Sequence, residues 1–217
     1  MRRRDWLAHC SAWAVAALAL AAGAGVAAVG ARHTVLVVGD SMSAEYGLAR
    51  GSGWVALLEK RLAAQKRSDV AVVNASVSGD TSSGGRSRLP ELLARYKPTV
   101  VVLELGGNDA LRGLPLTMTR DNLVAMTQAA QAGGARVLLV GMQVPPNYGR
   151  KYADDFAGLF ASVARAERAA VVPFLLKGVA DGPQAEALFQ ADRIHPNAQA
   201  QATMLDNVWA GLQPLLR

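Results

Sequence analysis

Short runs of consecutive apolar residues alternate along the chain with segments in which apolar residues recur every three or four positions. The runs are rich in β-branched residues and lack in–out alternation, which is typical of strands covered on both faces. They occupy residues 35–38, 70–73, 100–103, 137–140 and 171–172. This pattern predicts five buried strands.

The segments between these runs carry apolar stripes at helical spacing. The stripes are formed by Trp54, Leu57, Leu58 and Leu62; by Leu89, Leu92, Leu93 and Tyr96; by Phe156, Leu159, Phe160 and Val163; and by Leu205, Val208, Trp209 and Leu212. Strands that alternate with such helices predict one three-layer α/β/α domain, an open parallel sheet with helices on both faces. In such a sheet the functional residues follow the carboxyl ends of the strands.

The N-terminal segment has the features of a secretory signal peptide. Arg2, Arg3 and Arg4 precede an uncharged stretch over residues 6–31, which ends in small residues. We expect cleavage near residue 31, which leaves residues 32–217 as a single periplasmic or secreted domain. The alternative is an uncleaved membrane anchor, because the stretch is long enough to span a bilayer. Its richness in Ala and Gly, which partition weakly into lipid, favours cleavage.

Composition excludes several classes of function for the remaining chain. Removing residues 1–31 takes away three arginines and one aspartate, so the formal net charge falls from +6 to +4, too mild to indicate nucleic-acid binding. Arg86, Arg88, Arg95 and Lys97 are interpreted as a solvated helix face. The single cysteine lies in the signal segment, so we expect no disulfide, no metal and no cofactor.

Polar residues follow the predicted strands at the points where the cleft of this fold would lie. Gly39-Asp40-Ser41 ends the first run, Gly79 lies in the segment after the second, and Asn108 follows the third. Asp192 and His195 precede the last helix. Each motif alone has an ordinary structural reading as a turn or a helix cap. Their combination in this order is much more specific.

The three histidines leave one candidate for a catalytic base. His9 lies in the signal segment, and His33 falls at the start of the mature chain, where we expect disorder. His195 is therefore the plausible imidazole base, and Asp192 is close enough in sequence to orient it toward a nucleophilic Ser41. The developing oxyanion needs preorganised donors, for which Gly79, Asn108 and the Ser41 backbone are candidates.

These blocks resemble, in order, those of the SGNH/GDSL hydrolase superfamily. Residues 73–82, 103–113 and 146–150 narrow the resemblance to the bacterial periplasmic arylesterase, acyl-CoA thioesterase I and lysophospholipase group. The resemblance implies a flavodoxin-like five-stranded sheet and a broad range of ester and thioester substrates. It also implies Ser41 as nucleophile, His195 as base, Asp192 as its partner, and an oxyanion hole of Ser41, Gly79 and Asn108.

Two departures from the family pattern lie beside the nucleophile. Met42 replaces the usual leucine, a swap of similar volume that should be mild. Glu45 stands where relatives often carry glycine, and we expect it to affect the turn or the substrate preference. The loop over residues 110–116, with Leu111 and Leu114, is expected to border an acyl-chain groove. Asp40 and Pro146 complete the expected substrate contacts.

The sequence therefore predicts a monomeric serine esterase or thioesterase that acts on small-molecule esters, lysophospholipids among them, without nucleic acid or stable membrane insertion. A second hypothesis is an esterase that removes acetyl groups from carbohydrates, as other branches of the superfamily do. A third is a non-catalytic lipid-binding module. That reading expects the loss of at least one triad position, and none is lost here.

Overall fold

The computed structural model describes residues 32–217, and the predicted signal segment, residues 1–31, lies outside the described residues. Five parallel strands form one sheet in the order β2-β1-β3-β4-β5, which confirms the predicted flavodoxin-like sheet. The strands are β1 (His33–Gly39), β2 (Val70–Asn74), β3 (Val100–Glu104), β4 (Arg136–Val140) and β5 (Ala170–Val172).

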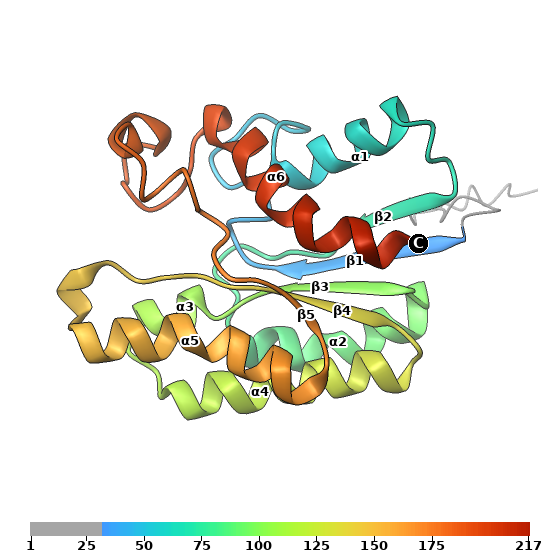
Figure 1. Cartoon of the computed structure of the whole chain (residues 1–217), viewed down its shortest axis with the longest axis horizontal. Coiled ribbons are helices and arrows are strands. Elements are labelled where there is room, and N and C mark those ends of the chain that lie inside the picture. Colours follow the sequence, from blue (N-terminus) through green and yellow to red (C-terminus); the bar gives the residue numbers. More distant parts are fainter. Residues whose placement is uncertain (1–31) are drawn as a thin grey trace, which may run out of the picture.

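Helices cover both faces of this sheet, as Figure 1 shows, so the predicted three-layer α/β/α fold is confirmed. On one face lie α1 (Trp54–Ala64) and α6 (Gln201–Leu212). On the other face lie α2 (Ser82–Tyr96), α3 (Gly107–Leu111), α4 (Leu116–Ala132) and α5 (Arg150–Glu167). Single turns of 3-10 helix are η1 (Pro146–Tyr148), η2 (Ala185–Leu188), η3 (Ala198–Ala200) and η4 (Gln213–Leu216). Within residues 32–217, no helix is long and apolar enough to cross a membrane.

The predicted apolar stripes form the interface between helices and sheet. Trp54 of α1, Phe156 and Phe160 of α5 and Val208 of α6 are fully buried. The remaining stripe residues are buried or pack, partly buried, against the same core. Because burying one such side chain contributes about 1.5–3 kcal/mol, these stripes fix the helices on the sheet.

Burial of the strands differs between the centre and the edges of the sheet. Every residue of β3 is buried, because β1 and β4 flank it and helices cover both its faces. The expectation of complete burial is wrong for the edge strands: residues 70–73 of β2 are only half-buried, and of residues 171–172 in β5 only Val172 is buried. An apolar run alone does not reveal this, because β2 and β5 are edge strands, each with a single neighbour.

Two local expectations are corrected by the structure. His33 is the first residue of β1 and pairs with Val70, so the expected disorder at this position is wrong. The segment 110–116 is not one loop, because Ala110 and Leu111 belong to α3 and Leu116 begins α4. Local backbone hydrogen bonds close this short helix, including one from the Arg112 N–H to the Asn108 carbonyl.

The strand order places the cleft of the molecule. From β1 the chain continues to β2 on one side of β1, whereas β3 lies on the other side of β1. The connections at the carboxyl ends of β1 and β3 therefore diverge, which opens a crevice at this point of an open parallel sheet. Ser41 follows β1, and Asn108 follows β3.

Candidate active site

Ser41 lies in a turn that is stabilised by hydrogen bonds to Asp40 and Glu104. The Asp40 carboxylate accepts the Met42 N–H through Oδ1 at 3.0 Å, and the Asp40 carbonyl accepts the N–H groups of Ser43 and Ala44. The Ser43 hydroxyl donates to the buried Glu104 carboxyl at 2.8 Å. The turn is thus fastened to the end of β3, which leaves the half-buried Ser41 side chain facing the cleft.

Ser41, His195 and Asp192 form a continuous chain of hydrogen bonds. The Ser41 Oγ lies 2.9 Å from His195 Nε2, and His195 Nδ1 lies 2.6 Å from Asp192 Oδ2. An ionised carboxylate can only accept, so the Nδ1 of a neutral imidazole carries the proton and Nε2 is left to accept from the serine hydroxyl. This is the tautomer that a base for Ser41 requires.

Backbone hydrogen bonds from the loop that carries His195 hold the Asp192 carboxylate in place. Its Oδ1 accepts the backbone N–H groups of Ile194 at 2.9 Å and of His195 at 3.0 Å. The hydrogen bonds from the His195 backbone and side chain, followed by that from Ile194, lower the pKa of Asp192 to about 2. The carboxylate therefore stays ionised over the whole range in which an imidazole titrates.

The imidazole is also fixed from the opposite side. The Tyr46 ring packs on His195 with 4.3 Å between the ring centroids and an angle of 39° between the planes. The Gln190 amide donates to the carbonyls of Tyr46 at 2.9 Å and Pro196 at 3.1 Å, which ties the two loops together. No sequence motif indicates the role of Tyr46, because this contact joins segments that are far apart in the chain.

Glu45, the departure noted beside the nucleophile, has an unusual backbone conformation. Its φ is 59°, in the left-handed region that favours glycine. Its carboxylate accepts the N–H of Gly51 at 3.0 Å and of Gly53 at 2.7 Å. The side chain therefore closes the loop that carries Tyr46, and these two bonds offset the backbone strain.

Two of the backbone N–H groups expected to bind an oxyanion have no acceptor within the described residues. Within residues 32–217, neither the Ser41 N–H nor the Gly79 N–H donates to an acceptor. Gly79 has φ of 79°, and the loop that carries it follows β2. The guanidinium of Arg112 donates to the Gly79 carbonyl at 2.9 Å and so holds the peptide unit that follows the Gly79 N–H.

The third expected donor, Asn108, is already engaged. Its amide donates one hydrogen bond to Asp40 Oδ2 at 3.0 Å and another to the Asp80 carbonyl at 2.9 Å. An amide group has two hydrogens, so a substrate oxyanion must share or displace one of these bonds. The sequence pattern does not indicate the pairing of Asn108 with Asp40, because the two residues follow different strands.

Asp40 and Glu104 form a buried carboxyl pair beneath the nucleophile. Burial is the main reason why the pKa of Asp40 is raised to about 6, against lowering contributions from its hydrogen bonds and from His195. Complete burial, and next the Asp40 charge, raise the pKa of Glu104 well above its ordinary value. Glu104 is therefore the better site for a proton, which leaves Asp40 as the acceptor for Asn108.

Arg88 joins three segments of the site from within helix α2. Its guanidinium pairs with Asp80 Oδ2 at 2.7 Å and donates to the carbonyls of Ala75 and, at 3.3 Å, Gly39. Only 24% of its side chain is exposed, so the interpretation of Arg88 as part of a solvated helix face is wrong. Helix periodicity cannot reveal this burial, because the covering residues come from the loop after β2.

Ser41 and His195 line a largely apolar cleft of about 480 Å³. Leu111 and Ile194 line this cleft, and 43% and 47% of their surfaces are exposed. The other residues along its wall include Met142, Val144, Pro145, Phe174 and Leu176. The arrangement can hold an apolar chain next to Ser41.

The four expected substrate contacts lie in different environments. Leu111 lines the cleft, whereas Leu114 is half-buried and is not part of the wall. Asp40 borders the cleft but is only 3% exposed, and both its oxygens already accept hydrogen bonds. Pro146 begins η1, and its side chain lies outside the described part of the structure.

A serine, an imidazole and a carboxylate in hydrogen-bond contact, beside free backbone donors, define the site of a hydrolase that uses a serine nucleophile. The chain belongs to the GDSL-like lipase/acylhydrolase family, whose model matches residues 37–203. The protein is therefore a hydrolase of this family, which confirms the resemblance noted from the sequence.

Relatives of known name cover nearly the whole chain. Esterase TesA of Pseudomonas aeruginosa is 54% identical over 186 residues, which cover 86% of this chain and 90% of the relative. Thioesterase 1/protease 1/lysophospholipase L1 of Escherichia coli K12 is 40% identical over 186 residues, 86% of each chain.

Solved structures agree with these relatives. The crystal structure of TesA matches with a TM-score of 0.79 and 54% identity, over 84% of this chain and 99% of that one. The psychrotrophic esterase EstA from Pseudoalteromonas sp. matches with a TM-score of 0.79 and 38% identity, over 85% and 98% of the chains.

Proposed function

We propose that this protein hydrolyses carboxylic esters and thioesters through an acyl-enzyme on Ser41. The hydrogen-bonded series from Ser41 through His195 to Asp192 is the observation that carries the proposal. Relatives named esterase, thioesterase and lysophospholipase support the same substrate classes.

In the acylation step, Ser41 Oγ attacks the carbonyl carbon while His195 Nε2 takes its proton. The carbonyl oxygen becomes an oxyanion, which the N–H groups of Ser41 and Gly79 and the amide of Asn108 stabilise. Each such donor is typically worth about 3–4 kcal/mol of barrier when it is removed. Collapse of the intermediate breaks the bond to the leaving oxygen or sulfur, which takes the proton from His195.

In the deacylation step, water replaces the leaving group. His195 takes a proton from the water, whose oxygen attacks the acyl carbon, and then returns the proton to Ser41 as the acid departs. Asp192 remains ionised throughout and stabilises the imidazolium that forms twice in each cycle.

The apolar cleft favours acyl chains longer than acetyl. Leu111 and Ile194 expose apolar surface along it, and a chain that covers them gains roughly 25 cal/mol for each Å² removed from water. We propose Leu111 as the wall of the acyl groove. An acetyl group is too short to cover this apolar surface, so the cleft argues against an esterase that acts only on acetylated carbohydrates.

The test is a chain-length series of p-nitrophenyl esters and acyl-CoA thioesters with wild type and Ser41→Ala. We expect activity on medium and long chains, and a loss of about a thousand-fold or more in Ser41→Ala. Ser162→Ala, on the exposed face of α5, removes a hydroxyl away from the cleft and is expected to retain full activity. Turnover that survives in Ser41→Ala would refute the acyl-enzyme, and activity on acetyl esters alone would indicate a carbohydrate esterase.

We also propose that residues 1–31 are a signal peptide and that residues 32–217 form the exported monomeric domain. The basic N-terminus and the uncharged stretch that follows support export to the periplasm or the medium. An intact mass of the exported protein that still includes residues 1–31 would indicate an anchored form instead. Sedimentation of the same material checks the expected monomer.

A further inference from the structure

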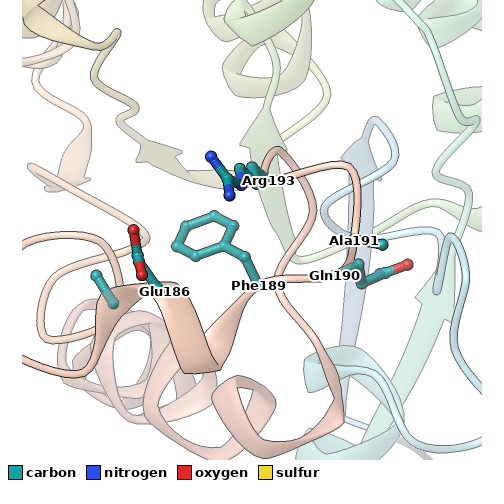
Figure 2. Close-up of a pocket in the computed structure, with 6 residues that line it drawn as sticks. Glu186, Phe189, Gln190, Ala191 and Arg193 are labelled. Carbon is teal, nitrogen blue, oxygen red and sulfur yellow. The ribbon is translucent and has the colours of Figure 1, made fainter.

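A second hollow of about 490 Å³ adjoins the cleft on the side of the histidine loop. Figure 2 shows that it is bordered by Glu186, Phe189 and Arg193, with Gln190 and Ala191 in the same loop. Phe189 and Arg193 also line the cleft that holds Ser41. The two spaces are therefore neighbours that share a wall.

The proposed chemistry assigns this side of the cleft to the leaving group. His195 Nε2 must deliver its proton to the departing oxygen or sulfur, so the leaving group lies on the histidine side of the scissile bond. Arg193 is two residues before His195 in the same loop. A leaving group that extends past the imidazole thus reaches the hollow.

Arg193 adopts a backbone conformation that L side chains rarely adopt. Its φ is 57°, and its N–H donates to the Gln190 carbonyl at 2.9 Å. Glycine would occupy this turn without strain, so the arginine is kept at a conformational cost. Arg168 has the same conformation at the end of α5, so it is the position of Arg193 on the walls of both the hollow and the cleft that makes its side chain a candidate for function.

Opposite charges flank the aromatic ring in this hollow. Figure 2 shows the Phe189 ring between the Arg193 guanidinium and the Glu186 carboxylate. Among residues 32–217, no salt bridge engages either charge. Two carboxylates on the adjoining cleft wall are already engaged: Asp181 accepts the N–H of Gly178, and Asp40 accepts hydrogen bonds from Met42 and Asn108. A ligand can therefore pair with both free charges.

We propose that this hollow is a leaving-group subsite for a zwitterionic phosphodiester, such as the phosphocholine part of a lysophospholipid. The guanidinium of Arg193 matches a phosphate through paired N–H donors. The Glu186 carboxylate and the face of Phe189 match a quaternary ammonium, which binds to aromatic rings and opposite charge. The subsite rests on the proposed esterase function, whose acyl chain occupies the other, apolar part of the cleft.

Hydrogen bonds within the loop that forms the hollow hold its shape. The Gln190 N–H donates to the His195 carbonyl at 2.8 Å, and Phe189 pairs with Pro196 in an isolated bridge. The side-chain amide of Asn197 donates to the Ala187 carbonyl at 2.7 Å. The subsite is therefore preorganised, which lowers the entropic cost of binding.

The test compares three substrates with one acyl chain: lysophosphatidylcholine, lysophosphatidylglycerol and a p-nitrophenyl ester, the lipids kept below their micellar concentration. For Arg193→Gly we expect KM to rise about ten-fold for both lipids, because the variant loses one charge-assisted hydrogen bond to the phosphate. For Glu186→Gln we expect a rise for the choline lipid alone. In Glu186→Gln, hydrolysis of the p-nitrophenyl ester should change less than about two-fold, because that ester carries no ammonium. In Arg193→Gly, which also alters the wall of the cleft, KM should rise more for the lipids than for the p-nitrophenyl ester, because only the lipids carry a phosphodiester.

Arg168→Gly is the matched control. Arg168 is also a left-handed arginine, with φ of 54°, at the far end of α5. Both glycine variants relieve strain, so both should unfold at the wild-type temperature or above it. An unchanged KM for the lipids in Arg193→Gly would overturn the subsite, and so would an equal rise for the p-nitrophenyl ester. An equal response of both lipids to Glu186→Gln would overturn the selectivity for an ammonium.

These outcomes separate the subsite from the esterase function itself. If the wild type fails to hydrolyse the p-nitrophenyl ester, the proposed function is wrong. If it hydrolyses that ester with normal kinetics in every variant and the lipid kinetics do not change, only the subsite is wrong.

Discussion

The side-chain amide of Asn108 donates a hydrogen bond to Asp40 Oδ2, at a distance of 3.0 Å. One of the proposed oxyanion donors is therefore held by the residue that precedes the proposed nucleophile, although 68 positions separate the two in sequence. Because the second amide hydrogen binds the Asp80 carbonyl, the orientation of Asn108 is fixed from two sides. We therefore propose that Asp40 acts on the reaction through Asn108.

Asp40→Asn is expected to lower kcat by roughly ten- to a hundred-fold with little change in KM, the cost of a misplaced catalytic group. In the wild type, each carboxylate oxygen of Asp40 accepts a hydrogen bond, one from Met42 and one from Asn108. In the variant, an NH₂ group replaces one of these oxygens and cannot accept that bond. Steady-state kinetics on one p-nitrophenyl ester measures the effect. Asp154→Asn on the exposed surface of α5 is the control. A rise in KM at constant kcat would instead make Asp40 a substrate contact.

Arg88→Lys is expected to lower kcat several-fold and to destabilise the fold by about 1–3 kcal/mol. Lysine keeps the charge, but it cannot bridge Asp80 and the carbonyls of Ala75 and Gly39 at once. The loop that carries Gly79 then loses its anchor. Kinetics and urea unfolding test this, with the exposed Arg95→Lys of the same helix as the control. Wild-type values for both quantities would show that Arg88 is dispensable.

The free energy of unfolding should decrease as the pH rises from about 4 to 7. The pKa of Asp40 is raised to about 6 in the folded protein, so its contribution is complete at low pH and is lost as the pH rises through that value. The size is on the order of 1–3 kcal/mol. The raised pKa of Glu104 acts in the same direction, whereas the lowered pKa of Asp192 acts oppositely, but below pH 4. Urea unfolding at pH 4.5 and 7 should show a flatter dependence in Asp40→Asn; an unchanged slope would contradict the assignment.

Glu45→Ala should be more destabilising than Glu45→Gly, by about 1 kcal/mol. Both variants lose the hydrogen bonds to the N–H groups of Gly51 and Gly53. Only alanine keeps the strain of φ near 59°. Thermal unfolding of the two variants decides the order, and the reverse order would show that the backbone at this position is not strained.

The layers of the fold and the triad could be predicted because their signals are local. Uninterrupted apolar runs predict the strands, and the short polar motif at the end of each predicted run marks the carboxyl edge of the sheet. The scarcity of histidines left His195 as the one candidate, and the structure places it 2.9 Å from Ser41.

The features that escaped prediction depend on contacts between distant segments. Arg88 lies on a polar helix, and only the tertiary fold brings the loop after β2 over it. Tyr46 meets His195 across more than a hundred residues of chain. The left-handed φ of Arg193 likewise reflects a turn that the loop imposes, since the residue type itself disfavours it.

The positions of the two chain ends have a practical consequence. His33 opens β1 at the amino edge of the sheet, and the carbonyl of Arg217 accepts a hydrogen bond from Arg136, the first residue of β4, at the same edge (Figure 1). The cleft lies at the opposite edge. An affinity tag, a fused partner or a solid support attached to either end of residues 32–217 therefore leaves the entrance of the cleft open to substrate.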